Sequence, residues 1–364
     1  MRLAWFTPTG VGSAADGFEA SGLIGELRAD HAIEVFDAAR AHDFVWMHAR
    51  DPFDLCVYDL DDTAAHAYIW AYPCHYPGLL RLPGEWLRTS RSAIRFRNER
   101  QSLVPPGITG SYGDPLAPLV MSARMVVVPD ASLADAMHER YPGARIRGAR
   151  IGAPALDAEL GREPGMVRVG TIPGSRGQSV ARAVQRAREG GASVVVDEHG
   201  SPGDAARRSD IVVALEWPPA SGLPRAAVLG LAAARAVVVF ESESTASLPC
   251  LDPQTWQPRG FGAQPPSVAV SLDPRDEEHS LLLALHRLTA DRALRAQLGA
   301  AGRAWWEGHA TIGRTADTWR TVIAEAAALG PTAVPAGRAA GAPDGSERAR
   351  AILAEIGATV DILD

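Results

Sequence analysis

The chain has 364 residues and a formal net charge of −7, and all 36 of its Lys and Arg residues are arginine. The absence of lysine excludes Schiff-base catalysis and the phosphate-binding lysine of P-loop proteins and protein kinases. The negative charge argues against general nucleic-acid binding, and the length suggests about two domains.

In the first half of the chain, short apolar runs alternate with segments of helical periodicity. We expect helices at 17–28 and 132–140, and the run 64–76 also has helical spacing. The expected strands are 2–6, 33–36, 55–58, 79–82 and 125–128. Such an alternation is typical of a parallel sheet that helices cover on both faces.

The same pattern restarts after about residue 160, which favours a second domain of the same kind. The expected strands are 166–170, 192–196, 211–215, 237–240 and 267–272, and the expected helices are 179–190, 225–234 and several from 277 onward. We therefore predict an α/β protein with two doubly wound, Rossmann-like domains. The predicted domains are 1–158 and 159–329, and 330–364 is expected to be a linker with a short tail helix.

The three cysteines, Cys56, Cys74 and Cys250, have no CxxC or CxxH spacing, so we expect neither a disulfide framework nor a zinc site. The longest apolar run, 226–240, contains Arg235 and is shorter than the ~20 residues that a membrane span needs. These features predict a cytoplasmic protein.

Four segments, taken together in their order, carry a resemblance to a known family. They are LAWFTPTGVGSAADGF (3–18), VYDLDDTAAHAYIWAYPCHYPGLLRL (57–82), IVVALEWPPASGLPRAAVLGLAAARAVVVFESES (211–244) and RLTADRALRAQLGAAGRAWWEGHATI (287–312). Together they resemble the retaining GT-B glycosyltransferases of family 4, which include the glycogen synthases. The resemblance covers residues 1–328 and implies a GT-B fold with closing C-terminal helices. It also implies transfer of a hexose from a nucleotide sugar, with retention and without a metal or other cofactor.

The chain departs from this family at several functional positions. The family carries two glutamates eight positions apart, and these positions align with Gly222 and Gly230. A variant alignment places Leu223 where the first glutamate belongs. Thr171 replaces the phosphate-binding arginine, and Arg176 stands near the place of the lysine. Arginine binds phosphate well, so this exchange alone is compatible with a donor site, whereas the loss of the carboxylates indicates a diverged active site.

The predicted donor site lies at the strand ends of the second domain. Its residues are Arg176, Ser221, Gly222, Arg225, Glu241, Ser242, Glu243, Ser244 and Thr245. Helix N-termini and an arginine can hold a diphosphate, and Glu241 or Glu243 can replace the missing glutamates. Other readings stay open: Arg176 as a surface side chain, Ser221 as an ordinary N-cap, and 241–245 as a capping segment.

The predicted acceptor side consists of residues from the first domain. Gly10, Gly12, Ser13 and Asp16 form the first βα loop, and His66 matches a histidine position in the resembling segment. An ordinary turn and a packed core histidine are the alternatives. Arg88, Arg91 and Arg95 fall on one helical face and suggest contact with an anionic membrane or acceptor, with a solvated helix face as the alternative.

The sequence therefore favours a glycosyltransferase that uses a nucleotide sugar, acts on an acceptor of unknown identity and has unassigned catalytic residues. The alternative is a non-catalytic GT-B homologue that serves as a partner or regulatory subunit. A third reading is another GT-B enzyme, such as a sugar epimerase, with a different donor.

Overall fold

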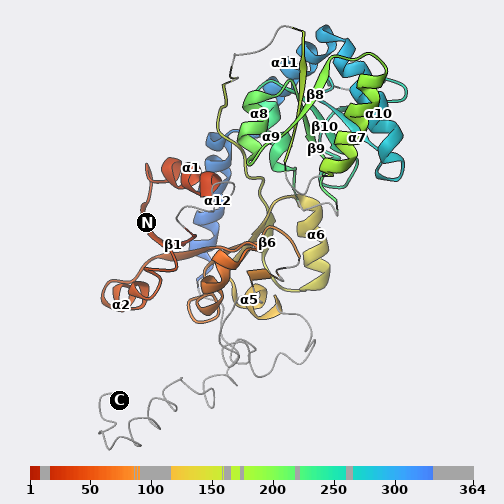
Figure 1. The fold of residues 1–364 in the computed structure, drawn as a ribbon. Helices are drawn as coiled ribbons and strands as arrows, with labels where there is room; N and C mark the ends of the chain where they lie inside the picture. The colour runs from red at the N-terminus through yellow and green to blue at the C-terminus, as the bar shows by residue number, and fades with distance from the viewer. Residues whose placement is uncertain are drawn as a thin grey trace, which may run out of the picture.

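A computed structural model describes residues 1–8, 17–85, 87, 89–90, 116–157, 159, 165–172, 176–217, 222–259 and 265–330. Each half of this part of the chain forms a domain around a six-stranded parallel sheet (Figure 1). The predicted α/β class with two Rossmann-like domains is confirmed. The predicted linker and tail helix after Gly330 lie outside the described residues.

The first sheet has the strand order β2-β1-β3-β4-β5-β6, and all neighbours pair in parallel. Its strands are β1 (Arg2–Phe6), β2 (Ala32–Phe36), β3 (Leu55–Asp59), β4 (Leu79–Arg81), β5 (Met125–Val128) and β6 (Ile146–Gly148). The accompanying helices are α1 (Gly17–Leu27), α2 (Asp43–Arg50), η1 (Ala64–Ala71), α5 (Ala117–Ser122) and α6 (Ala131–Arg140). Buried residues on both faces explain the nearly continuous apolar runs of β3 and β5.

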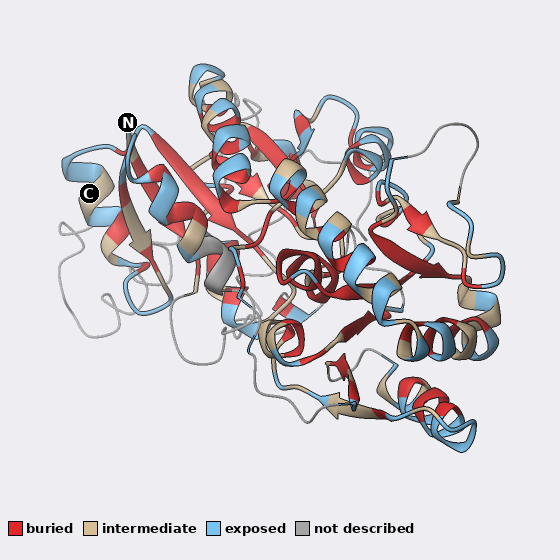
Figure 2. Ribbon diagram, turned by 90° about the horizontal axis from the view of Figure 1, so that it is seen from above, coloured by how far each residue is buried: buried red, intermediate tan, exposed pale blue. Residues whose placement is uncertain are grey.

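The second sheet has the order β11-β12-β10-β9-β7-β8 and is also parallel throughout. Its strands are β7 (Val167–Thr171), β8 (Val194–Glu198), β9 (Ile211–Ala214), β10 (Ala236–Phe240), β11 (Cys250–Leu251) and β12 (Ala269–Leu272). Its helices are α7 (Gly177–Glu189), α8 (Pro202–Arg208), α9 (Arg225–Ala232), η2 (Pro274–Asp276), α10 (Glu277–Ala290) and α11 (Arg292–His309). Figure 2 shows the central strands buried and the outer helices exposing one face.

The last described helix, α12 (Ile312–Ala328), returns to the first domain. Its residues Ala316, Trp319 and Ile323 are fully buried and pack in one core cluster with Leu3 and Trp5 of β1. The helix is amphipathic, but its sequence periodicity does not say which core receives its apolar face. The predicted second domain, 159–329, includes α12, whereas the buried face of α12 packs in the core of the first domain.

The chain therefore crosses between the domains twice, and the two crossings lie side by side. Gly152 N–H donates to Thr315 Oγ1 at 2.8 Å, and Ala153 N–H donates to the carbonyl of Ala310 at 2.9 Å. A Cβ atom on Gly152 would lie 2.4 Å from the Ala310 oxygen, so only glycine permits this approach. These bonds fix the two connections to each other.

Local structure differs from the sequence prediction in a few places. The segment 64–71 is a 3₁₀ helix rather than an α-helix. The short strands β6 and β11 and the helix α8 were not predicted, because three, two and seven residues are too few to display a clear hydrophobic period. No helix within the described ranges is long and apolar enough to span a membrane.

Candidate functional site

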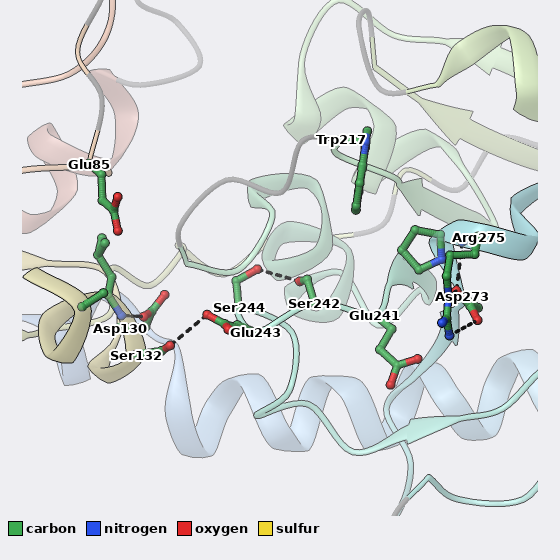
Figure 3. A pocket seen from close by; sticks show the side chains of 13 residues that line it. Glu85, Asp130, Ser132, Trp217, Glu241, Ser242, Glu243, Ser244, Asp273 and Arg275 are labelled. Carbon is green, nitrogen blue, oxygen red and sulfur yellow. Dashed lines mark hydrogen bonds and ion pairs between the residues drawn. The ribbon is translucent and has the colours of Figure 1, made fainter.

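A pocket of about 570 Å³ lies between the two domains, at the carboxyl ends of strands from both sheets (Figure 3). Its lining residues follow β4 and β5 in the first domain and β9, β10 and β12 in the second. They are Glu85, Asp130, Ser132, Leu133, Ala136, Trp217, Glu241, Ser242, Glu243, Ser244, Asp273, Pro274 and Arg275. Ligands of doubly wound domains bind at this edge of the sheet, so the pocket is the candidate site.

The pocket lining is acidic, with five carboxylate residues and one arginine. Three of the carboxylates have an arginine partner. Glu85 lies 3.6 Å from Arg140, Glu241 pairs with Arg259, and Asp273 lies 2.9 Å from Arg275. The hydrogen bonds from Arg275 lower the pKa of Asp273, so this carboxylate is charged at neutral pH. These ion pairs reduce the net negative charge that a bound ligand meets in the pocket.

Glu243 differs from these three, because no arginine or histidine of the described chain lies within ion-pair distance of it. Its Oε2 accepts a hydrogen bond of 3.1 Å from the hydroxyl of Ser132, which belongs to the other domain (Figure 3). The second carboxylate oxygen has no hydrogen-bond partner among the described residues. Glu243 can therefore accept a further hydrogen bond from a ligand hydroxyl.

The segment after β10 is a compact turn that directs Glu241 and Glu243 into the pocket. The Thr245 hydroxyl is buried and donates to the carbonyl of Phe240 at 2.7 Å, and Ser242 N–H donates to Thr245 Oγ1 at 3.0 Å. Ser242 and Ser244 join their hydroxyls at 2.9 Å. The predicted capping role of this segment and its predicted pocket role are thus compatible, since Thr245 builds the turn and the glutamates line the pocket.

Trp217, three residues after the end of β9, supplies an aromatic wall. Its side chain is 50% exposed and meets Phe240 edge to face, with ring centroids 6.2 Å apart. An exposed aromatic ring at a pocket wall can stack on a sugar ring or a nucleobase. Glu216, its neighbour, is largely buried, and this burial raises the pKa of its carboxyl group.

The positions aligned with the family's glutamates are closed to side chains. Gly222 has φ +80°, and a Cβ atom there would lie 2.6 Å from the Cβ of Pro129. A Cβ atom on Gly230 would lie 2.9 Å from Val237 and 3.2 Å from Val212 in the buried face of α9. Leu223, the alternative position, packs against the apolar core of the second domain. Two carboxylates of the pocket lining, Glu241 and Glu243, come instead from the turn after β10.

The remaining described candidates lie outside the pocket lining. Arg176 precedes α7 with a left-handed backbone (φ +51°), and its Nε lies 3.6 Å from Glu277. Arg225 is the first residue of α9. His66 is 4% exposed, and its Nδ1 lies 2.8 Å from Thr63 Oγ1, as expected of a packed histidine.

Eight predicted residues lie outside the described part of the chain, and their roles stay predictions. They are Gly10, Gly12, Ser13, Asp16, Ser221, Arg88, Arg91 and Arg95.

Several pocket residues were not singled out from the sequence, including Asp130, Trp217 and Asp273. All three follow predicted strands, at 125–128, 211–215 and 267–272, so their positions in the chain carried a usable signal. Within the described ranges, no group of three or more His, Cys, Asp or Glu residues has a geometry that could hold a metal ion.

Comparison with known proteins supports the fold but not a particular family. No protein-family model matches the sequence, and no curated protein matches it. The structure is similar to the catalytic domain of starch synthase IV from Arabidopsis thaliana bound to ADP and acarbose, with a TM-score of 0.58, 10% identity, and coverage of 90% of this chain and 99% of that chain. It is also similar to HepE from Anabaena in complex with UDP-glucose, with a TM-score of 0.55, 10% identity, and coverage of 89% and 99%.

A glycosyltransferase from Rickettsia africae gives a TM-score of 0.52 at 8% identity, with coverage of 89% of this chain and 98% of that chain. All three likenesses extend over both domains of this chain. The chain therefore has the GT-B fold.

Proposed function

We propose that the protein transfers a sugar from a nucleotide diphosphate sugar to an acceptor that binds in the pocket between the domains. The pocket at the strand ends of two facing Rossmann-like domains carries this proposal. In the similar structures named above, one protein holds ADP with acarbose and another holds UDP-glucose. The transferred sugar is proposed to be a hexose, with retention of configuration and without a metal or other cofactor.

Glu243 is the proposed carboxylate that accepts sugar hydroxyls, in place of the family's glutamate pair. It lines the pocket, one of its carboxylate oxygens accepts from the Ser132 hydroxyl, and the other has no hydrogen-bond partner among the described residues. Trp217 is proposed to stack on the base or the sugar, because half of its surface is exposed at the pocket wall.

The negative charge that develops on the leaving diphosphate needs positive partners. Arg275 belongs to the pocket lining. Arg176 precedes the 13-residue helix α7 and makes no side-chain cap hydrogen bond among the described residues, and the first amides of such a helix can bind an anion. We propose that these arginines and helix ends stabilise the leaving group. The excess of carboxylates elsewhere in the lining favours a neutral or positively charged acceptor over an anionic one.

A thermal-shift screen tests this function with UDP, ADP, dTDP and GDP and with their glucose and N-acetylglucosamine derivatives. We expect at least one nucleotide sugar to raise the melting temperature of the wild-type protein. Glu243→Gln should lower the affinity for the nucleotide sugar by about tenfold or more and so reduce the sugar-dependent part of the shift, since a hydrogen bond to a charged acceptor is worth ~1.5–3 kcal/mol. Glu189→Gln, at an exposed residue near the end of α7, is the matched control and should behave as the wild type.

A non-catalytic GT-B homologue is the second candidate, and the closed positions at Gly222 and Gly230 favour it. Under this alternative no nucleotide or nucleotide sugar in the screen shifts the melting temperature. An identical shift in the wild type and in Glu243→Gln would show that the donor binds but would contradict the proposed role of Glu243.

A further inference from the structure

Asp130 contacts both domains at once through its two carboxylate oxygens. It follows β5 and caps α6, where its Oδ1 accepts the N–H of Leu133 at 2.7 Å. Its Oδ2 accepts the N–H of Gly222, in the second domain, at 2.8 Å. Hydrogen bonds to a charged acceptor are stronger than neutral ones, so this is a strong bond between the domains.

The backbone around this bond is closely packed. Gly222 lies in the left-handed region at φ +80°, and the space where its Cβ atom would be is filled by Pro129, the residue before Asp130. The loop that leads into α9 therefore rests directly on the loop that leads into α6. The bond between Asp130 and Gly222 is partly buried, which strengthens it relative to an exposed one.

Besides the bonds between the two crossings, other hydrogen bonds of the described residues join the domains, and two of them are more exposed than the Asp130 contact. Ser132 donates to Glu243 at 3.1 Å, and Arg150 Nη2 donates to Ser247 Oγ at 3.0 Å. Arg150 also lies over the Trp305 ring, 5.3 Å from its centroid. Each of these two bonds runs from the first domain to the second, as the bond between Asp130 and Gly222 does.

The Gly222 N–H precedes the first turn of α9, and amides at such a position favour negatively charged partners. In the protein the partner is its own Asp130 carboxylate. A phosphate or carboxylate ligand that approaches this loop would meet an occupied donor and a negative charge.

We propose that Asp130 is an interdomain latch, which holds the loop before α9 against the first domain and must release Gly222 before the domains can separate and widen the pocket. The latch depends on contacts within the chain and not on the proposed transferase activity. It makes the spacing of the two domains sensitive to a single carboxylate.

The test compares Asp130→Ser and Asp130→Thr with the wild type by single-molecule energy transfer. Both replacements keep a good helix cap for Leu133 but are too short to reach Gly222. Dyes are placed on cysteines introduced at Glu139 of α6 and Arg188 of α7, which are exposed, whereas the native cysteines Cys56, Cys74 and Cys250 are buried. We expect both variants to shift the distribution to lower transfer efficiency in the absence of any ligand.

Asp291→Ser is the matched control, because Asp291 caps α11 through Leu294 N–H at 2.9 Å without joining the domains. It should keep the wild-type distribution. Circular dichroism identifies any variant that fails to fold, and the two Asp130 replacements provide independent readings. Folded Asp130 variants with the wild-type distance distribution would overturn the proposal, as would an equal shift in Asp291→Ser.

Discussion

The indole ring of Trp319 in α12 lies against that of Trp5 in β1, with ring centroids 5.4 Å apart. The two rings join the last described helix to the first strand and so close the chain on itself. Both side chains are almost fully buried. The first domain is therefore completed by a segment that lies more than 300 residues away from its start.

Truncation of Trp319 should therefore weaken the first domain. Large-to-small replacement of a buried aromatic residue typically costs ~3–5 kcal/mol, so Trp319→Ala should lower the free energy of unfolding by about that amount. Denaturant unfolding measures this cost. Trp46→Ala is the control, because Trp46 on α2 is 80% exposed, and it should change stability by less than ~0.5 kcal/mol. Equal effects of the two replacements would contradict the described docking of α12.

Gly222 is expected to tolerate no side chain. Gly222→Ala combines the strain of a positive φ, ~1–2 kcal/mol, with a clash against Pro129. Gly143→Ala separates the two effects, because Gly143 has φ +91° and no atom within 4 Å of the added Cβ. Thermal unfolding should show a lower melting temperature for both variants and a clearly larger decrease for Gly222→Ala. If Gly143→Ala lowers stability as much as Gly222→Ala, the interdomain contact at Pro129 is not tight.

Arg176 offers a variant that separates binding from stability. Its left-handed backbone suits glycine better than arginine, whereas loss of the ion pair with Glu277 costs stability, so Arg176→Gly should change the melting temperature only slightly. The same variant removes the guanidinium and should weaken nucleoside diphosphate binding by about tenfold or more if Arg176 holds a phosphate. Calorimetric titration measures the affinity. Unchanged affinity would assign Arg176 only to its ion pair with Glu277.

The raised pKa of Glu216 gives the stability a definite pH dependence. Burial disfavours the charged form, so the native state holds this proton at a higher pH than the unfolded chain does. Between the unfolded and the folded pKa, the free energy of unfolding therefore falls as the pH rises. Glu216→Gln should stabilise the protein at neutral pH and have less effect below about pH 4, where both states are protonated. A larger gain at low pH than at neutral pH in urea unfolding would contradict this assignment.

Much of the fold could be predicted from the sequence, because buried parallel strands leave continuous apolar runs such as Val237–Phe240. The docking of α12 could not be predicted, since an amphipathic period shows that a helix has a buried face without showing which core it meets. The contact of Pro129 and Asp130 with Gly222 could not be predicted either, because it depends on how two separately folded domains meet.

The pocket was predicted in part. Glu241 and Glu243 were identified because two carboxylates and three hydroxyls follow one strand, and both glutamates line the pocket. Asp130 and Trp217 also follow the carboxyl ends of strands, but the neighbouring residues in the sequence do not form a comparable cluster of carboxylates and hydroxyls. Arg176 was selected by its place in the resemblance, and its side chain contacts Glu277 rather than the pocket lining.

The most direct test of the proposed glycosyl transfer is release of nucleoside diphosphate from a panel of UDP-, ADP-, dTDP- and GDP-hexoses. The slow transfer of sugar to water in the absence of an acceptor gives a readout that needs no knowledge of the acceptor. We predict that the wild-type protein releases the nucleoside diphosphate from at least one of these donors and that Glu243→Gln reduces the rate by about tenfold or more. Release from none of the donors, at concentrations well above typical KM values of 1 μM to 1 mM, would contradict the proposed function.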